Sequence, residues 1–511
     1  PDGNSTRRGY LCSMKSNRFP LLILSAALLL VLPSGAAKPK KSFPKLDQVF
    51  TPEKLKEDFR VLQDALEKLH PGLYLYTPKE KFGQLFKDTH LAFQKPATVR
   101  DFYLRVGPVV EKAKCGHTYF DLPWRLLNQL QKEEPLFPLP LFFLNRKAYV
   151  DLEGQPIPLG AEVTAVNGTP MTEILPKLLP YLRSDGFNET MKYRMLGDEF
   201  ALHYRLVFGA ERIFEIEHTA PGAELKEKKN VEAIPGNQLQ KNLLRRHSGR
   251  GKLKNYQFKW ADNIGILSIN SFDFGLNKKG RQKYRSFLKK TFTEINSREQ
   301  VSNLIIDARF NEGGYAGNDS LLFSYLTKKP FREAKSVIAK TLDIPLEDFL
   351  DKKEFFRGIE KAVEKSLNKE FVRNNHGILQ MIDEKNKIHK HKANAFEGMM
   401  YFLISGWTHS GGSVLCSMAL NNDNVVFIGE ETGGGHEFYT AGNMVLYTLP
   451  NTQCQVEVPM IRYQSNSPAN AFPKGSGIRP HHSVTQTRED FIKGTDTVMQ
   501  FTLDLIKAKK N

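Results

Sequence analysis

The chain has 511 residues and a mass of 58.2 kDa, which corresponds to two to four domains at about 100–200 residues each. Hydrophobic residues make up 40% of it and charged residues 25%, and glycine and proline are spread along the chain, which excludes disordered, collagen-like and coiled-coil proteins. The formal net charge is +17, but acidic residues are interspersed with the basic ones, as on an ordinary solvated surface, so we expect no nucleic-acid partner.

The N-terminal segment has the pattern of a secretory signal. After Met14, the basic residues Lys15 and Arg18 precede an apolar stretch at 19–32, and small residues follow it. This stretch is shorter than the about 20 residues that a membrane-crossing helix needs. We therefore assign residues 1–37 to an upstream extension and a signal peptide. We expect an exported protein, periplasmic or extracellular, with no membrane insertion after signal removal.

Three cysteines follow the predicted signal, at positions 115, 416 and 454, so at most one disulfide can form. Cys416 lies in an apolar helical pattern, which favours a buried free thiol.

Residues 46–135 are predicted to form an N-terminal helical domain. Apolar residues recur at helical spacing over about 52–69, 79–93 and 98–113, and Thr51-Pro52-Glu53 is a typical start of the first helix. Gly116-His117-Thr118 then breaks the helical pattern and leads into β-rich residues. A histidine is thus placed at the junction.

Residues 137–250 change to period-two patterns and short strands. The strand that runs up to Asn167-Gly168 is followed by an amphipathic helix at 171–182. The spacing of Gly160, Val163, Asn167 and Gly168 resembles a PDZ-type module, which binds extended peptide ends as an added edge strand. We therefore predict these four residues as peptide-binding, with an ordinary β-hairpin as the alternative.

From 256 to 511 strands and helices alternate, which predicts an α/β core. The predicted strands are 264–269, 304–307, 400–404, 425–428 and 444–449, and the predicted helices are 284–295, 320–326 and 411–420. The charged stretch 331–397 has little periodicity that would place it in a sheet, so we expect a helical insertion there. The expected fold class is an α/β catalytic core with an N-terminal helical domain and a PDZ-like β-rich domain, multidomain α+β overall.

Two motifs at strand ends carry the candidate chemistry. In the first, a buried strand leads into Asp307-x-Arg309-x-Asn311-x-Gly313-Gly314, where glycines let backbone N–H groups approach an oxyanion. The alternative is a tight turn with a structural Arg–Asp pair. In the second, Thr408-His409-Ser410 joins a strand to a helix, so that the Ser410 hydroxyl lies at the positive end of the helix dipole. Its alternative is simple helix capping by serine.

Together these motifs resemble the carboxyl-terminal processing (tail-specific) protease family, in its tricorn-core-like, histidine-using branch. The resemblance extends to three further segments: Gly116-His117-Thr118, Gly429-Glu430-Glu431-Thr432-Gly433-Gly434 and Gly477-Ile478-Arg479-Pro480. It implies a serine endopeptidase that cleaves peptides or proteins through an acyl-enzyme, with Ser410 as nucleophile. The N–H groups of Gly411 and of Gly313 or Gly314 would hold the oxyanion. We expect no cofactor and no metal ion.

The same resemblance implies which residue is the base. Many members use a lysine at the position that holds Gly435 here, and no lysine lies between Ser410 and Lys474, which excludes a Ser–Lys pair. Other members use a histidine that matches His117, and a neutral imidazole can accept the serine proton. The glutamate that orients the imidazole in those members is replaced here by Lys474-Gly475-Ser476. Glu430 and Glu431 are then the candidates for the orienting acid.

Other functions have less support in the sequence. The histidines at 409, 436, 481 and 482 are scattered, without the spacing of a catalytic zinc site. A Cys115–His117 nucleophile pair is sterically awkward. The alternative that stays open is a catalytically weak or inactive secreted binding protein on the same fold, which would hold a peptide or an apolar ligand.

Overall fold

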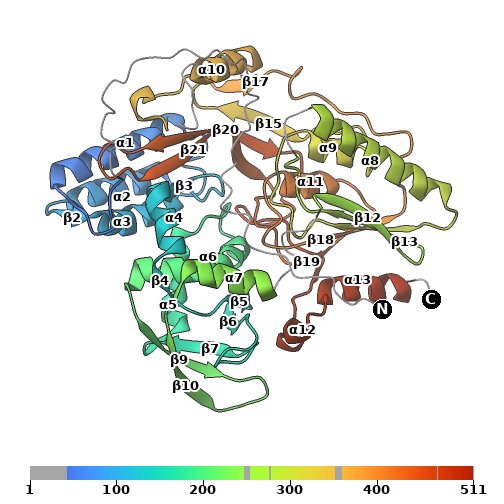
Figure 1. Ribbon diagram of the computed structural model, residues 1–511. Helices are drawn as coiled ribbons and strands as arrows, with labels where there is room; N and C mark the ends of the chain where they lie inside the picture. The colour runs from blue at the N-terminus through green and yellow to red at the C-terminus, as the bar shows by residue number, and fades with distance from the viewer. Residues whose placement is uncertain (1–42, 247–253, 275–277, 352–358, 469, 510–511) are drawn as a thin grey trace, which may run out of the picture.

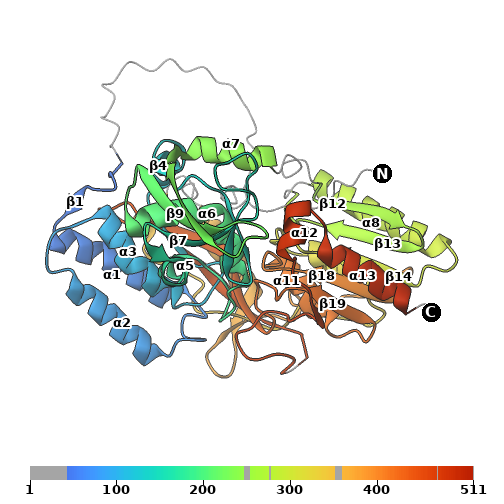
Figure 2. The same ribbon diagram turned by 90° about the horizontal axis from the view of Figure 1, so that it is seen from below.

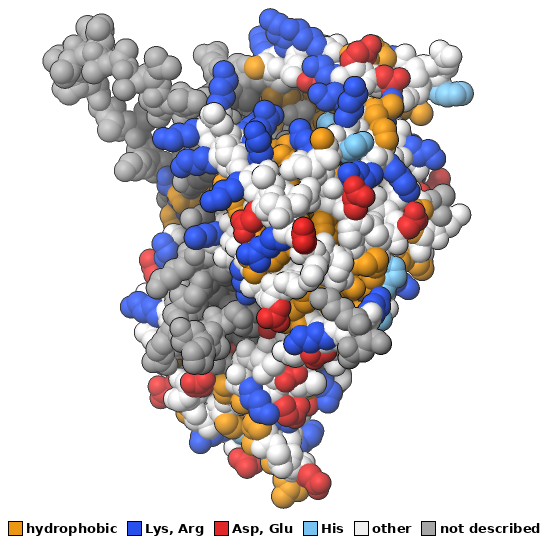
Figure 3. All heavy atoms as spheres, turned by 90° about the vertical axis from the view of Figure 1, so that its right-hand side faces the viewer, with side chains coloured by type: hydrophobic (Ala, Val, Ile, Leu, Met, Phe, Trp, Pro, Cys, Tyr) orange, Lys and Arg blue, Asp and Glu red, His pale blue; other side chains and the backbone are white. Residues whose placement is uncertain are grey.

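The computed structural model describes residues 43–246, 254–274, 278–351, 359–468 and 470–509 (Figure 1). The predicted signal peptide at 1–37 lies outside the described residues. In the described part of the chain, no helix is both long enough and apolar enough to cross a membrane. Figure 3 shows a face of the molecule on which Lys and Arg side chains are interspersed with Asp and Glu.

The N-terminal helices form where the apolar spacing predicts them. They are α1 (Pro52–Leu69), α2 (Lys79–Ala92) and α3 (Val99–Glu111), followed by α4 (Trp124–Lys132), and the short strands β1 (Val49–Phe50) and β2 (Ala97–Thr98) pair beside them. Their apolar faces meet in a cluster of rings that includes Phe59, Phe86 and Phe93. This packing holds the end of α3, from which the chain runs to His117.

A second unit is built on a sheet of order β10-β9-β7-β6-β5. Its strands are β5 (Leu141–Leu144), β6 (Lys147–Val150), β7 (Glu162–Val166), β9 (Ile213–Thr219) and β10 (Lys226–Glu232), with β8 (Thr169–Pro170) paired to β7. The helices of this part are α5 (Met171–Leu178), α6 (Thr190–Phe208) and α7 (Gly236–Arg246), with a 3₁₀ turn at Leu179–Tyr181 and the pair β4 (Pro135–Leu136) and β11 (Ile234–Pro235).

The predicted peptide-binding residues do not lie at an edge of this sheet. Val163 is in β7, which pairs with β9 on one side and with β6 and β8 on the other. Gly160 precedes this strand, and Asn167 and Gly168 form the turn after it. Because both sides of β7 are occupied, a peptide cannot add along these residues, and we correct the assignment on that ground.

The α/β core contains a sheet of order β12-β13-β14-β18-β19-β22, parallel from β13 onward. Its strands are β12 (Tyr256–Ala261), β13 (Ile264–Ile269), β14 (Asn303–Asp307), β18 (Met399–Ile404), β19 (Val425–Gly429) and β22 (His482–Ser483). One face packs against α8 (Lys278–Ser297), α9 (Asn318–Phe323) and α11 (Gly411–Ala419), and α13 (Thr497–Ala508) covers the other (Figure 2). Burial of both faces explains the continuous apolar strand sequences.

The stretch 331–397 is not a purely helical insertion. It contains α10 (Ile359–Glu370) and a 3₁₀ turn at Glu347–Phe349, but also β15 (Ala334–Ala339), β16 (Phe371–Arg373) and β17 (Leu379–Met381). These strands join β20 (Phe438–Thr448) and β21 (Gln455–Ser465) in the sheet β16-β17-β15-β21-β20. The expectation of a helical insertion is therefore wrong, because the partner strand of β15 lies much later in the chain. Residues 352–358 lie outside the described residues.

This second sheet ties the N-terminal region to the core. β3 (Tyr119–Asp121) pairs antiparallel with β21, so the chain just after His117 is fixed against the core. Cys115, Cys416 and Cys454 are buried free thiols, as expected for Cys416. The molecule as a whole is a multidomain α+β protein.

Candidate active site

Ser410 occupies a sharp turn between β18 and α11. Its backbone has φ 51° and ψ −126°, a conformation that non-glycine residues rarely adopt. Backbone hydrogen bonds hold the turn on both sides, from His409 N–H to Asn311 O at 3.0 Å and from Gly434 N–H to Thr408 O at 3.2 Å. A nucleophile on a strained strand-to-helix turn presents its hydroxyl above the sheet, at the start of the helix.

His117 lies next to this hydroxyl. Its Nε2 is 3.2 Å from Ser410 Oγ, although the two residues are 293 positions apart in the chain. The structure therefore brings together the predicted nucleophile and the predicted base. For Nε2 to accept the serine proton, the ring proton must be on Nδ1.

The two Gly-rich turns face the nucleophile. A Cβ on Gly313 would lie 2.6 Å from Ser410 Cβ and 2.7 Å from Gly411 N, so only glycine fits there. The Gly313 N–H donates to Asn311 Oδ1 at 2.9 Å and is already engaged. Within the described part of the chain, the N–H groups of Gly314 and Gly411 have no hydrogen-bond acceptor. These two donors are the pair left for an oxyanion.

A buried carboxylate that the sequence analysis missed lies beside His117. Asp185, in the loop between α5 and α6, accepts the Gly116 N–H at 2.7 Å and the Gly435 N–H at 3.2 Å. One of its oxygens, a ring nitrogen of His117 and Cys115 Sγ all lie within 4.8 Å of one another. His117 Nδ1 has no hydrogen-bond partner among the described residues, and such catalytic contacts often tighten only when substrate binds.

A second histidine approaches the same carboxylate. His409 Nε2 is 3.5 Å from Asp185 Oδ2, and the ring centroids of His409 and His117 are 4.7 Å apart. Burial tends to raise the pKa of Asp185, but the hydrogen bond and charge of His409, together with His117 and the Gly116 N–H, outweigh it and hold this pKa below its ordinary value. Asp185 is therefore an ionised carboxylate inside the protein.

The same surroundings keep His117 neutral. Burial lowers the pKa of His117 to about 3, and His409 adds to this effect while Asp185 opposes it. A neutral imidazole beside a serine hydroxyl is the form that can accept its proton.

The two glutamates predicted as orienting acids have other contacts. Glu430 accepts from Arg194 Nε at 3.0 Å, and Glu431 accepts the Gly477 N–H at 2.7 Å. Among the described residues, neither carboxylate is hydrogen-bonded to His117. Asp185 is better placed for the role. Its sequence context, Ser184-Asp185-Gly186, is typical of an ordinary turn and carried no signal of a site.

The remaining predicted residues lie away from Ser410. Gly160 packs against Ile492, since a Cβ there would come within 2.5 Å of its side chain, and Asn167 Oδ1 accepts the Glu215 N–H at 2.8 Å. Both contacts serve the structure of the β-rich unit.

Comparison with known proteins finds a family match over part of the chain and a shared fold. No curated protein matches this sequence. Among solved structures, mature CPAF is 14% identical with a TM-score of 0.60, covering 90% of this chain and 99% of that one. Mature CPAF complexed with lactacystin is also 14% identical, with a TM-score of 0.61 and coverage of 89% and 99%. At this identity the likeness shows the fold alone.

The family model described as peptidase family S41 matches residues 263–484. This segment contains Ser410 and both Gly-rich turns, whereas His117 and Asp185 lie before it. This segment is therefore similar to peptidase family S41, the C-terminal processing protease family, and the match supports a serine-type peptidase that acts on peptides or proteins.

Proposed function

We propose that this protein is an exported serine endopeptidase in which Ser410 is the nucleophile, His117 the base and Asp185 the orienting acid. The observation that carries the proposal is the 3.2 Å approach of His117 Nε2 to the hydroxyl of a serine on a strained turn. The buried, ionised Asp185 beside the imidazole supports it. An orienting acid is thus available, which removes the main argument for an inactive binding protein.

The reaction follows from these positions. Ser410 Oγ attacks the scissile carbonyl carbon as its proton moves to His117 Nε2, and the Gly314 and Gly411 N–H groups stabilise the negative carbonyl oxygen. His117 then passes the proton to the leaving amine, and the acyl-enzyme forms. Water, deprotonated by the same nitrogen, attacks the acyl carbon, and His117 returns the proton to Ser410 Oγ as the second product leaves. Asp185 holds the proton on Nδ1 and stabilises the imidazolium of each step.

We do not assign tail recognition to the β-rich unit. The sheet edge at β5 is the one beside α6, where a peptide would join a PDZ-type groove. At this edge a Cβ on Gly197 would lie 3.4 Å from Leu141 O, so helix and strand are already in contact. Cleavage rates should therefore be the same for substrates with free and amidated C-termini.

Covalent labelling tests the nucleophile. A fluorophosphonate probe should label the purified protein at Ser410, and Ser410→Ala should lose both labelling and peptide cleavage with little change in thermal stability. Ser417→Ala is the matched control, since Ser417 lies on the same helix and donates to His436 O at 3.2 Å. Equal labelling of Ser410→Ala would overturn the assignment.

Export is proposed from residues 14–37, which lie outside the described residues. Edman or mass-spectrometric sequencing of the exported protein should find its N-terminus just after Ala37.

A further inference from the structure

We propose that Cys115, His117 and Asp185 form an inhibitory zinc site, in which a bound Zn²⁺ ion takes the catalytic base out of action. The sequence alone indicated no metal. The inhibition rests on the proposed role of His117, whereas the metal binding does not, and the two can be measured separately.

The three side chains are zinc-type ligands that the fold brings together. Cys115 Sγ, a ring nitrogen of His117 and a carboxylate oxygen of Asp185 lie within 4.8 Å of one another. A thiolate, an imidazole and a carboxylate are the three ligand types that zinc takes in proteins. Cys115 and His117 are two residues apart, and Asp185 is fixed between them by the Gly116 N–H.

A buried nitrogen without a partner points to a missing ligand. Among the described residues, His117 Nδ1 has no hydrogen-bond partner, although buried polar atoms are normally paired. Since His117 Nε2 faces Ser410, Nδ1 is the nitrogen open to an ion. His409 Nε2, 3.5 Å from Asp185 Oδ2, lies beside the site and is not one of its three ligands.

The distances between the proposed ligand atoms would fit a zinc ion if these atoms moved slightly closer together. Two ligands of one tetrahedral zinc ion are about 3.3–3.8 Å apart, given metal–ligand bonds of about 2.0–2.3 Å. The separations among the Cys115, His117 and Asp185 ligand atoms, up to 4.8 Å, need to shrink by about 1 Å. Cys115 Sγ would exchange its weak contact with Thr440 O, at 3.6 Å, for the metal.

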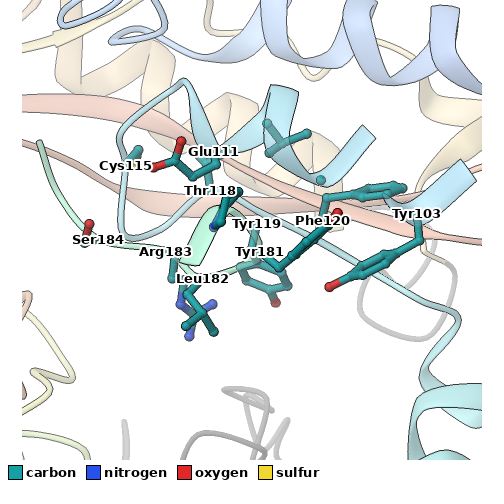
Figure 4. Close-up of a pocket in the computed structure, with 13 residues that line it drawn as sticks. Tyr103, Glu111, Cys115, Thr118, Tyr119, Phe120, Tyr181, Leu182, Arg183 and Ser184 are labelled. Carbon is teal, nitrogen blue, oxygen red and sulfur yellow. The ribbon is translucent and has the colours of Figure 1, made fainter. Parts of the chain in front are cut away.

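A small pocket adjoins the thiol. It has a volume of about 20 Å³, enough for one water-sized occupant, and Cys115, Glu111 and Arg183 are among the residues that line it. Figure 4 shows Cys115 and Glu111 near each other on one side and Tyr103 on the opposite side. Of the three proposed ligands, only Cys115 lines this pocket.

The chemistry of the imidazole explains the inhibition. A neutral imidazole that binds zinc through Nδ1 carries its proton on Nε2, the tautomer opposite to the one that catalysis needs. Nε2–H then faces Ser410 Oγ as a donor and cannot accept its proton. Because its carboxylate then binds the zinc ion, Asp185 no longer orients the imidazole. The Cys115 thiol releases its proton to solvent on binding, so zinc should bind more tightly as pH rises.

Cobalt spectroscopy tests the metal site without any assay of activity. Co²⁺ added to the metal-free full-length protein should give the near-ultraviolet charge-transfer band of a cobalt–thiolate bond. Cys115→Ser should lose this band, and Cys416→Ser, which changes another buried free thiol, should keep it. A cobalt complex of the unchanged protein without the thiolate band would overturn the proposal, whether or not the protein cleaves peptides.

Zinc inhibition tests the switch. Zn²⁺ should inhibit cleavage by the unchanged protein and by Cys416→Ser at the same concentration, whereas Cys115→Ser should need about 10–100-fold more, the usual effect of weakening a metal site. Zn²⁺, but not Mg²⁺, should also raise the unfolding temperature of the unchanged protein. If Cys115→Ser does not fold, the unfolding temperature of the unchanged protein still tests the proposal. If Zn²⁺ does not raise this temperature, the protein has no zinc site. Equal inhibition of Cys115→Ser and unchanged protein would contradict the role of Cys115.

Discussion

At the scale of single residues, Asp185 is the buried charged group at which several contacts of the site meet. Backbone N–H groups of Gly116 and Gly435 fix its two oxygens, and His117 and His409 approach it from the nucleophile's side. A carboxylate oriented in this way, and ionised in spite of burial, needs no rearrangement to stabilise an imidazolium that forms beside it.

We therefore predict that Asp185→Asn lowers kcat by about 10²–10⁴-fold while KM changes little, because the amide cannot stabilise the imidazolium. Steady-state kinetics would measure this, with circular dichroism to confirm folding. Glu430→Gln and Glu431→Gln are matched controls and should retain most of kcat. If kcat fell as much in either control as in Asp185→Asn, the acid that orients His117 would be a glutamate and not Asp185.

The pKa of His117 predicts the shape of the pH profile. A base must be neutral, and burial lowers the pKa of His117 to about 3, far below the ordinary value of 6.5. As pH falls, activity should be lost only near this lowered value. The plot of kcat/KM against pH should thus be flat from pH 7 down to at least pH 5, within the range in which the protein stays folded. A half-maximal point near 6.5 would show that His117 titrates normally.

At the scale of elements, the helix α12 (Arg488–Lys493) fastens the C-terminal region to the β-rich unit. Arg488 donates to Gly160 O at 2.6 Å and to Thr219 O at 2.7 Å, and the Phe491 ring stacks on Phe142 with centroids 4.9 Å apart. Gly160 is needed for this contact, because its φ is +76° and a Cβ would overlap Ile492.

We predict that Gly160→Ala destabilises the protein by about 1–3 kcal/mol more than Gly168→Ala. Both glycines have φ near +75°, so both variants carry the same backbone strain of about 1–2 kcal/mol. Only at Gly160 does the added methyl group meet another side chain. Urea unfolding would measure the difference. In the Gly160→Ala background, Ile492→Ala should remove part of the extra loss of stability. Equal stability of Gly160→Ala and Gly168→Ala would show that α12 shifts to make room for the methyl group without a cost in free energy.

At the scale of the whole molecule, the site exists only where three regions meet. Ser410 comes from the core, His117 from the loop after the N-terminal helices and Asp185 from the β-rich unit. Asn188, just before α6, joins two of these regions, since its Nδ2 donates to Thr432 O at 3.0 Å and Gly433 O at 2.9 Å. The loop of Asp185 is thereby held against the loops beside the nucleophile.

Loss of these hydrogen bonds should lower both the stability of the protein and its kcat. Asn188→Ala leaves the buried Thr432 O without its donor, which costs about 1–3 kcal/mol, and we predict a fall in kcat of at least about tenfold as Asp185 loses its exact placement. Asn424→Ala is the matched control, because Asn424 also donates to two backbone carbonyls, Glu397 O and Gly398 O, away from Ser410. Similar kcat values for the two variants would contradict the prediction.

The amino-acid sequence by itself determined the elements whose pattern is local. Helical spacing of apolar residues placed α1, and uninterrupted apolar runs placed β13, β14 and β18 within a residue or two. Gly-Gly pairs and a serine at a strand-to-helix junction marked the region of Ser410, the proposed nucleophile, because those turns need particular residues at fixed positions.

Only the tertiary structure decided which distant segments meet. The pairing of β15 with β21, the burial of β7 inside its sheet and the approach of Asp185 to His117 leave no trace in local periodicity. Each depends on contacts between residues far apart in the chain, and such contacts follow from how whole units pack. An Asp-Gly turn has the same local sequence wherever it occurs, and only the fold places this one beside His117, the proposed base.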